Sequence, residues 1–221
     1  MSGLRVPCLC LITDRRQLSP DARTALDELD ALERWLDEAI GRVDLIQIRE
    51  PDLDARVLYD VSSRVAARAG RSGTAAVVND RADVARAALA DGVHLRADGP
   101  PVDRVRAVSA SGWLIGRSVH ALEEVAAQRT ADYLVFGTVF PSRSKPAGAR
   151  VHGLVGLGAA VRTASVPLLA IGGVDPARAK GCRQVGAAGI AAIGLFLPPG
   201  RAPQAMGIGP AVEALRAAMA N

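Results

Sequence analysis

Eight short apolar runs alternate with amphipathic segments along this chain, and this alternation is the strongest constraint on its fold. The runs are candidate strands at residues 8–13, 44–49, 75–79, 92–95, 113–117, 133–136, 167–171 and 189–194. Between them, apolar residues recur at spacings of three and four, as Leu29, Leu32 and Leu36 do, which places them on one helical face. Strands that alternate with helices form parallel βα units.

Eight such units in 221 residues predict a single domain, residues 1–221, folded as a (β/α)8 TIM barrel. An open doubly wound sheet produces the same alternation and is the alternative, but the number of units favours closure. Hydrophobic residues make up 49% of the chain and aromatic residues only 3%, so Ala, Val, Leu and Ile must build the core. That composition suits strands that are buried on both faces.

The charge and apolar patterns exclude several classes of partner. The formal net charge is +4, but the arginines are interleaved with acidic residues instead of forming a basic stripe, so no nucleic-acid partner is expected. The apolar run 6–12 is too short for a membrane span, so we expect no membrane association and a cytoplasmic location. Cys8, Cys10 and Cys182 lack metal or redox spacing and are expected to pack in the core.

Polar residues follow several candidate strands, where a parallel barrel carries its active site. Gln47 and Arg49 alternate with isoleucines on the second run, so they are predicted to point into the barrel mouth and bind substrate. A buried Arg49 that pairs with Glu50 or Asp14 is the alternative.

The third, fourth and fifth runs supply further candidates. Asn79 and Asp80 can present an amide and a carboxylate to a ligand, or can cap the next helix. His94 lies between apolar neighbours and is interpreted as a packed core residue. Ser118 and His120 share a direction, so Ser118 is a predicted substrate ligand and His120 the predicted acid/base, with helix capping as the alternative for His120.

The ends of the last three runs predict an anion site. Lys145, a predicted substrate ligand, lies in a long basic segment at 141–153 that can close over an anion, and a solvated loop cation is the alternative. Gly172-Gly173 and Ile193-Gly194 end the seventh and eighth runs, whose loops form the recurrent phosphate site of such barrels. Glycines there let backbone N–H groups approach a phosphate oxygen, although Gly172-Gly173 can also simply form a tight turn.

Six motifs, in order along the chain, resemble those of the thiamin phosphate synthase superfamily. They are Gln47-Ile48-Arg49-Glu50, Asn79-Asp80-Arg81, Ala90-Asp91-Gly92-Val93-His94-Leu95, Gly116-Arg117-Ser118-Val119-His120, Gly137-Thr138-Val139-Phe140-Pro141 and Ala170-Ile171-Gly172-Gly173. The resemblance implies a barrel, a homodimer and a place in thiamin biosynthesis, with a phosphorylated thiazole as substrate.

The superfamily has two branches, and departures in this chain bear on the choice between them. Thiamin phosphate synthases join a hydroxymethylpyrimidine diphosphate to a thiazole phosphate with Mg²⁺, whereas TenI-like thiazole tautomerases aromatise a thiazole carboxylate phosphate. The synthase pattern has a lysine where this chain has Pro51, and a second magnesium carboxylate where it has Gly99. Asp80 matches the first magnesium ligand, and Asp98 is displaced by one residue from the position of the second.

From these departures we expect a TenI-like thiazole tautomerase, an isomerase that needs no cofactor. The resemblance places the catalytic histidine of that branch at His120. Two alternatives stay open. One is a thiamin phosphate synthase that uses Mg²⁺ with Asp80 as a ligand, and the other is a non-catalytic regulatory homologue that binds a phosphate ligand.

Overall fold

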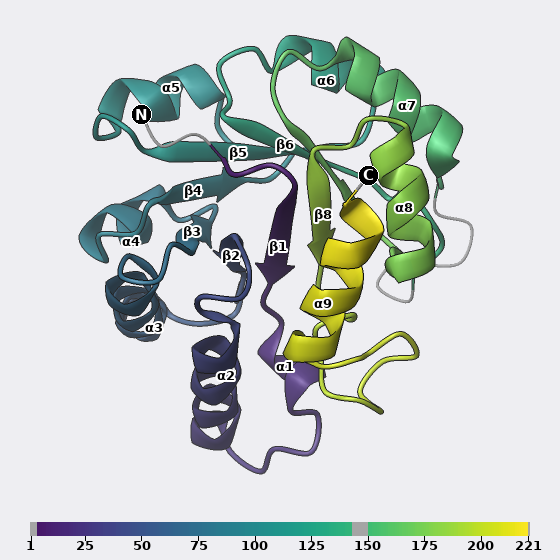
Figure 1. Ribbon diagram of the computed structural model, residues 1–221. Helices are drawn as coiled ribbons and strands as arrows, with labels where there is room; N and C mark the ends of the chain where they lie inside the picture. The colour runs from purple at the N-terminus through teal and green to yellow at the C-terminus, as the bar shows by residue number, and fades with distance from the viewer. Residues whose placement is uncertain (1–3, 143–149, 221) are drawn as a thin grey trace.

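Eight parallel strands close into a barrel, which confirms the predicted fold and excludes the open sheet (Figure 1). The computed structural model describes residues 4–142 and 150–220. Each strand pairs with its neighbours in the sequence, and the last pairs with the first. The strands are β1 Cys8–Ile12, β2 Leu45–Ile48, β3 Ala75–Asn79, β4 Gly92–Leu95, β5 Leu114–Val119, β6 Tyr133–Phe136, β7 Leu168–Ile171 and β8 Gly189–Ala192.

Helices follow the strands and surround the barrel (Figure 1). Cap chemistry sets several of their starts: Thr24 and Asp27 form a capping box before α2, and Asp54 accepts hydrogen bonds from the first turn of α3. Asp175 caps the start of α8 by accepting from the N–H of Arg178, and Pro176 occupies its first turn. The helices are α1 Arg15–Leu18, α2 Ala25–Ala39, α3 Ala55–Ala69, α4 Ala82–Ala87, α5 Val102–Val108, α6 Leu122–Ala127, α7 Gly153–Thr163, α8 Pro176–Gln184 and α9 Ile208–Met219.

The apolar core has an inner and an outer layer. Side chains that point into the barrel fill its interior, and they are Cys8, Cys10, Ile12, Leu45, Val77, Leu114, Tyr133, Val135, Leu169 and Ala191. Residues that alternate with them, such as Leu9, Ile46 and Val78, are buried against the helices. Gln47 and Asn79 follow Leu45 and Val77 by two residues, so they continue the inner face toward the carboxyl ends of the strands. The interior therefore becomes polar at its mouth.

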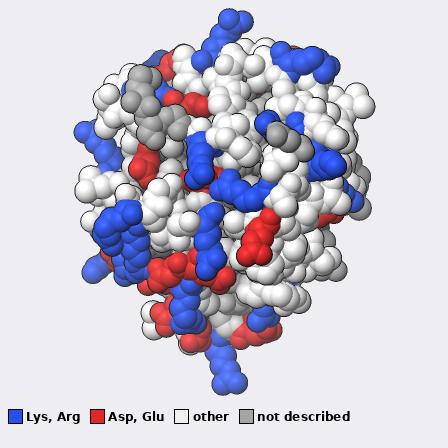
Figure 2. All heavy atoms as spheres, in the orientation of Figure 1, with Lys and Arg blue, Asp and Glu red and all other residues white. Residues whose placement is uncertain are grey.

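The three cysteines are free and buried, as predicted. No helix within the described residues is long and apolar enough to cross a membrane. On the face in Figure 2, basic and acidic side chains are interspersed. Ion pairs between helices, such as that of Arg64 with Glu33, balance part of the arginine charge.

Candidate active site

Two adjoining cavities open at the carboxyl ends of the strands. The large cavity, of about 670 Å³, is lined mainly by the ends of β2 to β6 and the loops after them. The small cavity, of about 360 Å³, lies at the ends of β7 and β8. Both are lined by Gln17, Ser142, Ile171, Gly172 and Ile193. They therefore form one mouth with two halves.

Most of the predicted site residues line this mouth. The large cavity is lined by Gln47, Arg49, Asn79, Ser118 and His120. The small cavity is lined by Gly172, Gly173, Ile193 and Gly194. The prediction for Lys145 falls outside the described residues. Asp80 lines neither cavity, and its carboxylate contacts Arg96, which does line the large one.

A chain of side-chain hydrogen bonds crosses the end of β3. Gln47 Nε2 donates to Asn79 Oδ1 at 2.8 Å, and Asn79 Nδ2 donates to Asp80 Oδ2 at 3.0 Å. Neither Asn79 nor Asp80 caps α4, which has no side-chain cap, so the capping alternative is wrong. Gln47 Oε1 is buried without a partner among the described residues. A ligand N–H group would satisfy this acceptor.

Arg49 does not form the ion pair that was its alternative interpretation. Glu50 instead accepts from Arg15 Nη1 at 3.0 Å, and Asp14 accepts from the side chain of Gln17. Within the described residues, no carboxylate forms a salt bridge with Arg49. Its guanidinium charge lines the large cavity and is available to an anionic ligand.

Arg15 ties the loop after β1 to the loop after β2. Its guanidinium is buried and contacts Glu50 and Asp52, while its Nε lies 2.8 Å from Glu28 Oε2 without hydrogen-bond geometry. Burial raises the pKa of Glu50 and outweighs the opposing effect of Arg15. The hydrogen bond from Arg15 lowers the pKa of the more exposed Asp52 to about 2. This buried cluster fixes the loop that follows Arg49.

His94 is buried, as predicted, but it also belongs to the site. Its Nδ1 lies 3.1 Å from the Tyr133 hydroxyl and its Nε2 lies 2.9 Å from Ser118 Oγ. A Cβ on Gly116 would lie 2.1 Å from the Tyr133 ring, so glycine is required there for this contact. Gly116 lies beside His94 in the register of β5 against β4, and this register is not visible in the sequence.

The hydrogen-bond directions in this trio can be assigned. Burial, with a smaller contribution from Arg117, lowers the pKa of His94 to about 3, so its ring is neutral near pH 7. Burial raises the pKa of Tyr133, whose hydroxyl has His94 as its one partner within residues 4–142 and 150–220, so that hydroxyl donates to Nδ1. Nε2–H then donates to Ser118 Oγ, and the Ser118 hydroxyl proton is left for a ligand oxygen.

His120 is held from the neighbouring strand. Its Nδ1 lies 2.6 Å from the carbonyl oxygen of Gly137, and its backbone N–H donates to Glu124 Oε2 at 2.6 Å. A carbonyl oxygen can only accept, so Nδ1 carries a proton and Nε2 is the ring atom left for the cavity. The side chain does not cap α6, so that alternative is wrong.

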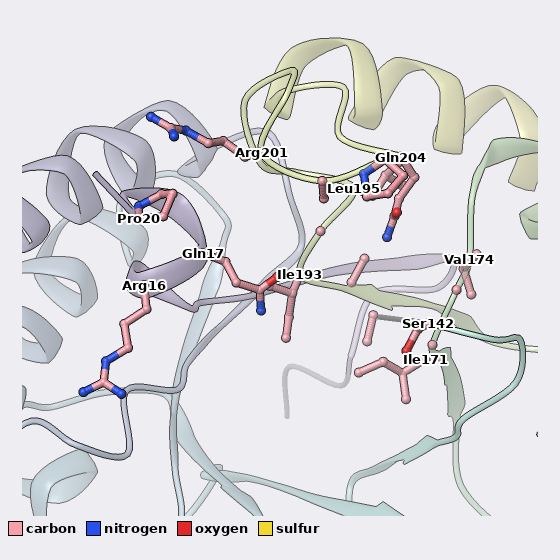
Figure 3. A pocket seen from close by; sticks show the side chains of 17 residues that line it. Arg16, Gln17, Pro20, Ser142, Ile171, Val174, Ile193, Leu195, Arg201 and Gln204 are labelled. Atoms are coloured by element: carbon pink, nitrogen blue, oxygen red, sulfur yellow. The ribbon is translucent and has the colours of Figure 1, made fainter. Parts of the chain in front are cut away.

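Glycines shape the small cavity. Gly172 and Gly173 have φ values of +99° and +60°, and a Cβ on Gly173 would lie 2.3 Å from the carbonyl oxygen of Pro141. The N–H groups of Gly173 and Gly194 donate no hydrogen bond to any described residue. Figure 3 shows Gln204 directed into the cavity, while Arg16 and Arg201 extend away from it. Unpaired backbone donors with an amide beside them can bind a phosphate group.

The residues near Asp80 do not fit a magnesium ion. Arg96 Nε lies 2.6 Å from Asp80 Oδ2, and the Arg96 backbone N–H donates to Oδ1 at 2.8 Å, so both oxygens are already bonded. Across the described residues, no group of three His, Cys, Asp or Glu side chains could hold a metal. Magnesium usually binds through one or two carboxylates with substrate phosphates, and here a guanidinium lies on the carboxylate in question.

Comparison with known proteins identifies the family to which the chain is similar. The model of a family described as thiamine monophosphate synthase matches residues 9–196. A putative thiamine-phosphate synthase of Geobacter sulfurreducens is 37% identical over 191 residues, which cover 86% of this chain and 86% of the relative. A thiamine-phosphate synthase of Desulfitobacterium hafniense is 34% identical over 191 residues, which cover 86% of this chain and 88% of the relative. A solved thiamine phosphate pyrophosphorylase from Pyrococcus furiosus has a TM-score of 0.78 and 32% identity, and the match covers 96% of this chain and 95% of that one.

These relatives overturn the tautomerase expectation. Proteins that match most of the chain are named as synthases, which are transferases, and not as isomerases. The expectation treated Pro51 and Gly99 as the loss of one anion-binding half of the mouth. The structure places two arginines, Arg49 and Arg96, in the wall of that half, so its positive charge is retained.

The family match, the two relatives and the solved structure all extend over most of the barrel. This chain belongs to the thiamine monophosphate synthase family.

Proposed function

We propose that this protein is a thiamine-phosphate synthase that joins a hydroxymethylpyrimidine diphosphate to a thiazole phosphate. The observation that carries the proposal is the divided mouth, in which cavities of about 670 and 360 Å³ share five lining residues. Two anionic substrates can lie side by side in such a mouth with their reacting atoms near the shared wall.

The transfer reaction requires anion binding more than proton transfer. The lone pair of the thiazole nitrogen forms the new C–N bond, while the C–O bond to the diphosphate breaks and its electron pair leaves with the diphosphate. No proton moves at the reacting atoms. A site for this reaction therefore needs donors aimed at the oxygens on which negative charge develops.

The large cavity supplies donors of this kind for the diphosphate. Arg49 brings a guanidinium that pairs with no described carboxylate, and Ser118 brings the hydroxyl proton that His94 leaves available. Gln47 Oε1, which no described donor contacts, offers an acceptor to an N–H group of the pyrimidine substrate. Asn79, which donates to Asp80 and accepts from Gln47, holds that acceptor in place.

The small cavity suits the thiazole phosphate. The N–H groups of Gly173 and Gly194, which have no acceptor among residues 4–142 and 150–220, face the phosphate oxygens in this arrangement. Ile171 and Ile193 supply an apolar surface for the ring. Lys145 stays a predicted anion ligand. The homodimer expected from the resemblance also stays a prediction.

Incubation of the purified protein with both substrates tests the proposal. Thiamine phosphate should form, as detected by liquid chromatography with mass spectrometry, and His120→Asn should lower kcat/KM by less than the roughly 10²-fold loss that marks general acid/base catalysis. A loss of 10²- to 10⁴-fold in that variant would show that a proton transfer limits the reaction.

The same incubation separates the remaining alternatives. Binding of both substrates without product supports the non-catalytic homologue. A protein that neither binds nor converts them contradicts the proposed function.

A further inference from the structure

The proposed reaction does not yet explain Arg96, whose side chain contacts the Asp80 carboxylate just after β3. Arg96 Nε contacts Asp80 Oδ2 at 2.6 Å and its own backbone N–H donates to Oδ1 at 2.8 Å. The same carboxylate accepts from Asn79 Nδ2 at 3.0 Å. Asp80 thus has a cation and two further donors, and its bonding capacity toward another cation is largely used.

The loop that carries Arg96 is fixed in place. Arg117, which is buried, donates to the carbonyl oxygens of Ala97 and Pro100 at 2.6 Å each. A Cβ on Gly99 would lie 3.1 Å from the carbonyl oxygen of Arg96 and 3.6 Å from Asp80 Oδ1. The loop therefore packs closely around the Asp80 carboxylate, at the position where a second magnesium carboxylate is missing.

No described residue accepts a hydrogen bond from the terminal nitrogens of Arg96. Its contacts with Asp80, and the longer one of 3.5 Å with Asp98, are made through Nε. Its Nη1 and Nη2 donate no hydrogen bond to any described residue, and the side chain is 61% exposed at the large cavity. A guanidinium that is anchored through Nε presents two terminal nitrogens, which match two oxygens of a phosphate group.

We propose that Arg96 occupies the place of a divalent cation in this site. Arg49 and Arg96 together hold the diphosphate, and Asp80 anchors Arg96 instead of a metal. The inference rests on the proposed synthase function for the identity of its anion. It predicts that the protein binds diphosphate through guanidinium groups, with no requirement for magnesium.

Titration calorimetry with inorganic pyrophosphate tests this inference without any turnover. The wild-type protein should bind pyrophosphate in the presence of EDTA. Arg96→Ala should weaken that binding about 10- to 100-fold, the usual effect of losing hydrogen bonds from a charged group. Arg104→Ala, which removes an exposed arginine from α5, is the matched control and should bind as the wild type does.

Magnesium gives a second readout that a merely damaged site would not produce. In Arg96→Ala the Asp80 carboxylate is released, so excess MgCl₂ should restore pyrophosphate binding. The added change Asp80→Asn should remove this restoration. Arg96→Ala is thus expected to gain a magnesium dependence that the wild type lacks.

Three results would overturn the inference. They are wild-type binding that appears only with magnesium, Arg96→Ala binding in EDTA that equals that of the wild type, and a loss in Arg96→Ala that magnesium does not restore. The proposed function fails separately. Pyrophosphate binding as expected, without any thiamine phosphate formed from the two substrates, rejects the synthase and leaves the role of Arg96 standing.

Discussion

His94 lies between a phenol and a serine hydroxyl, and its neutral ring links the barrel interior to the ligand. Tyr133 belongs to the inner core layer, whereas Ser118 lines the large cavity. Because the buried ring resists protonation, it keeps Ser118 oriented as a donor throughout the neutral pH range. Burial of the neutral His94 ring lowers the free energy of unfolding only at acid pH, where the ring is protonated in the unfolded chain.

Acid titration of stability should reveal His94. Its pKa is about 3 in the folded protein against the ordinary value of 6.5 for histidine, so between these pH values the unfolded state holds a proton that the folded state lacks. The contribution of His94 to stability is complete above pH 6.5 and decreases toward pH 3, by at most about 1.4 kcal/mol per pH unit.

His94→Gln removes this titration while retaining a polar side chain. The difference in unfolding free energy between wild type and His94→Gln should therefore shrink as pH falls from 6.5 toward 4, when measured by urea denaturation. The carboxylates titrate in both proteins and cancel in the difference. A difference that does not change with pH would mean that the folded protein binds the proton as readily as the unfolded chain does.

At the residue scale, strand alternation predicts which side chains enter the mouth but not what they contact. Gln47 and Ser118 lie where their alternation along β2 and β5 places them. His94 was interpreted as core because its neighbours are apolar, and it is indeed buried. Its role as partner to Ser118 depends on the space above Gly116, which only the register of β4 against β5 discloses.

At the scale of elements, α1 was not predicted. It is a single turn at Arg15–Leu18, too short to show any helical periodicity, and Asp14 caps it by accepting from the N–H of Gln17. β5 also continues to Val119, two residues beyond the predicted end of the fifth run, so Ser118 lies within a strand and not in a loop. Its rigid backbone suits a residue that must aim a hydroxyl group.

The cluster around Arg15 should stabilise the β1 and β2 ends strongly. The Arg15 side chain is 6% exposed and that of Glu50 is 2% exposed, so Arg15→Met leaves a buried carboxylate without its partner. We expect the free energy of unfolding to fall by about 3–5 kcal/mol. Urea denaturation followed by circular dichroism measures the loss.

Arg64→Met is the matched control for this measurement. Arg64 pairs with Glu33 between α3 and α2, but its side chain is 49% exposed, so the loss of that pair should cost about 0–1 kcal/mol. Equal effects of the two substitutions would show that the Arg15 cluster does not stabilise the fold as a buried network.

At the scale of the whole molecule, the number of βα units correctly predicts the closed barrel. The activity is predicted wrongly, because that prediction rests on two single residues that differ from the synthase pattern. The chain has Pro51 where the synthase pattern has a lysine, and Gly99 where that pattern has a magnesium carboxylate. Both differences are visible in the sequence. The compensation is not visible there, because Arg96 comes to Asp80 only after β3 and β4 pair and the loop after β4 folds back. Charge in the mouth is a property of the assembled barrel.

The assembled mouth also makes a prediction about two ligands. If the large and small cavities are separate anion sites, pyrophosphate and a thiazole phosphate should bind together, and their effects on thermal stability should add. Each ligand at 100 times its dissociation constant contributes about 2.7 kcal/mol to the folded state, so the two together should contribute about twice that amount. Differential scanning calorimetry with each ligand and with both measures the sum.

Gly173→Ala assigns the two contributions to their cavities. A Cβ at this position requires a residue with φ of +60° and lies 2.3 Å from the carbonyl oxygen of Pro141, so the small cavity must distort. The variant should lose the response to thiazole phosphate and keep the response to pyrophosphate, which also reports that the barrel is folded. If instead either ligand abolishes the effect of the other in the wild type, the two cavities act as a single site, and the mouth cannot bring two substrates together.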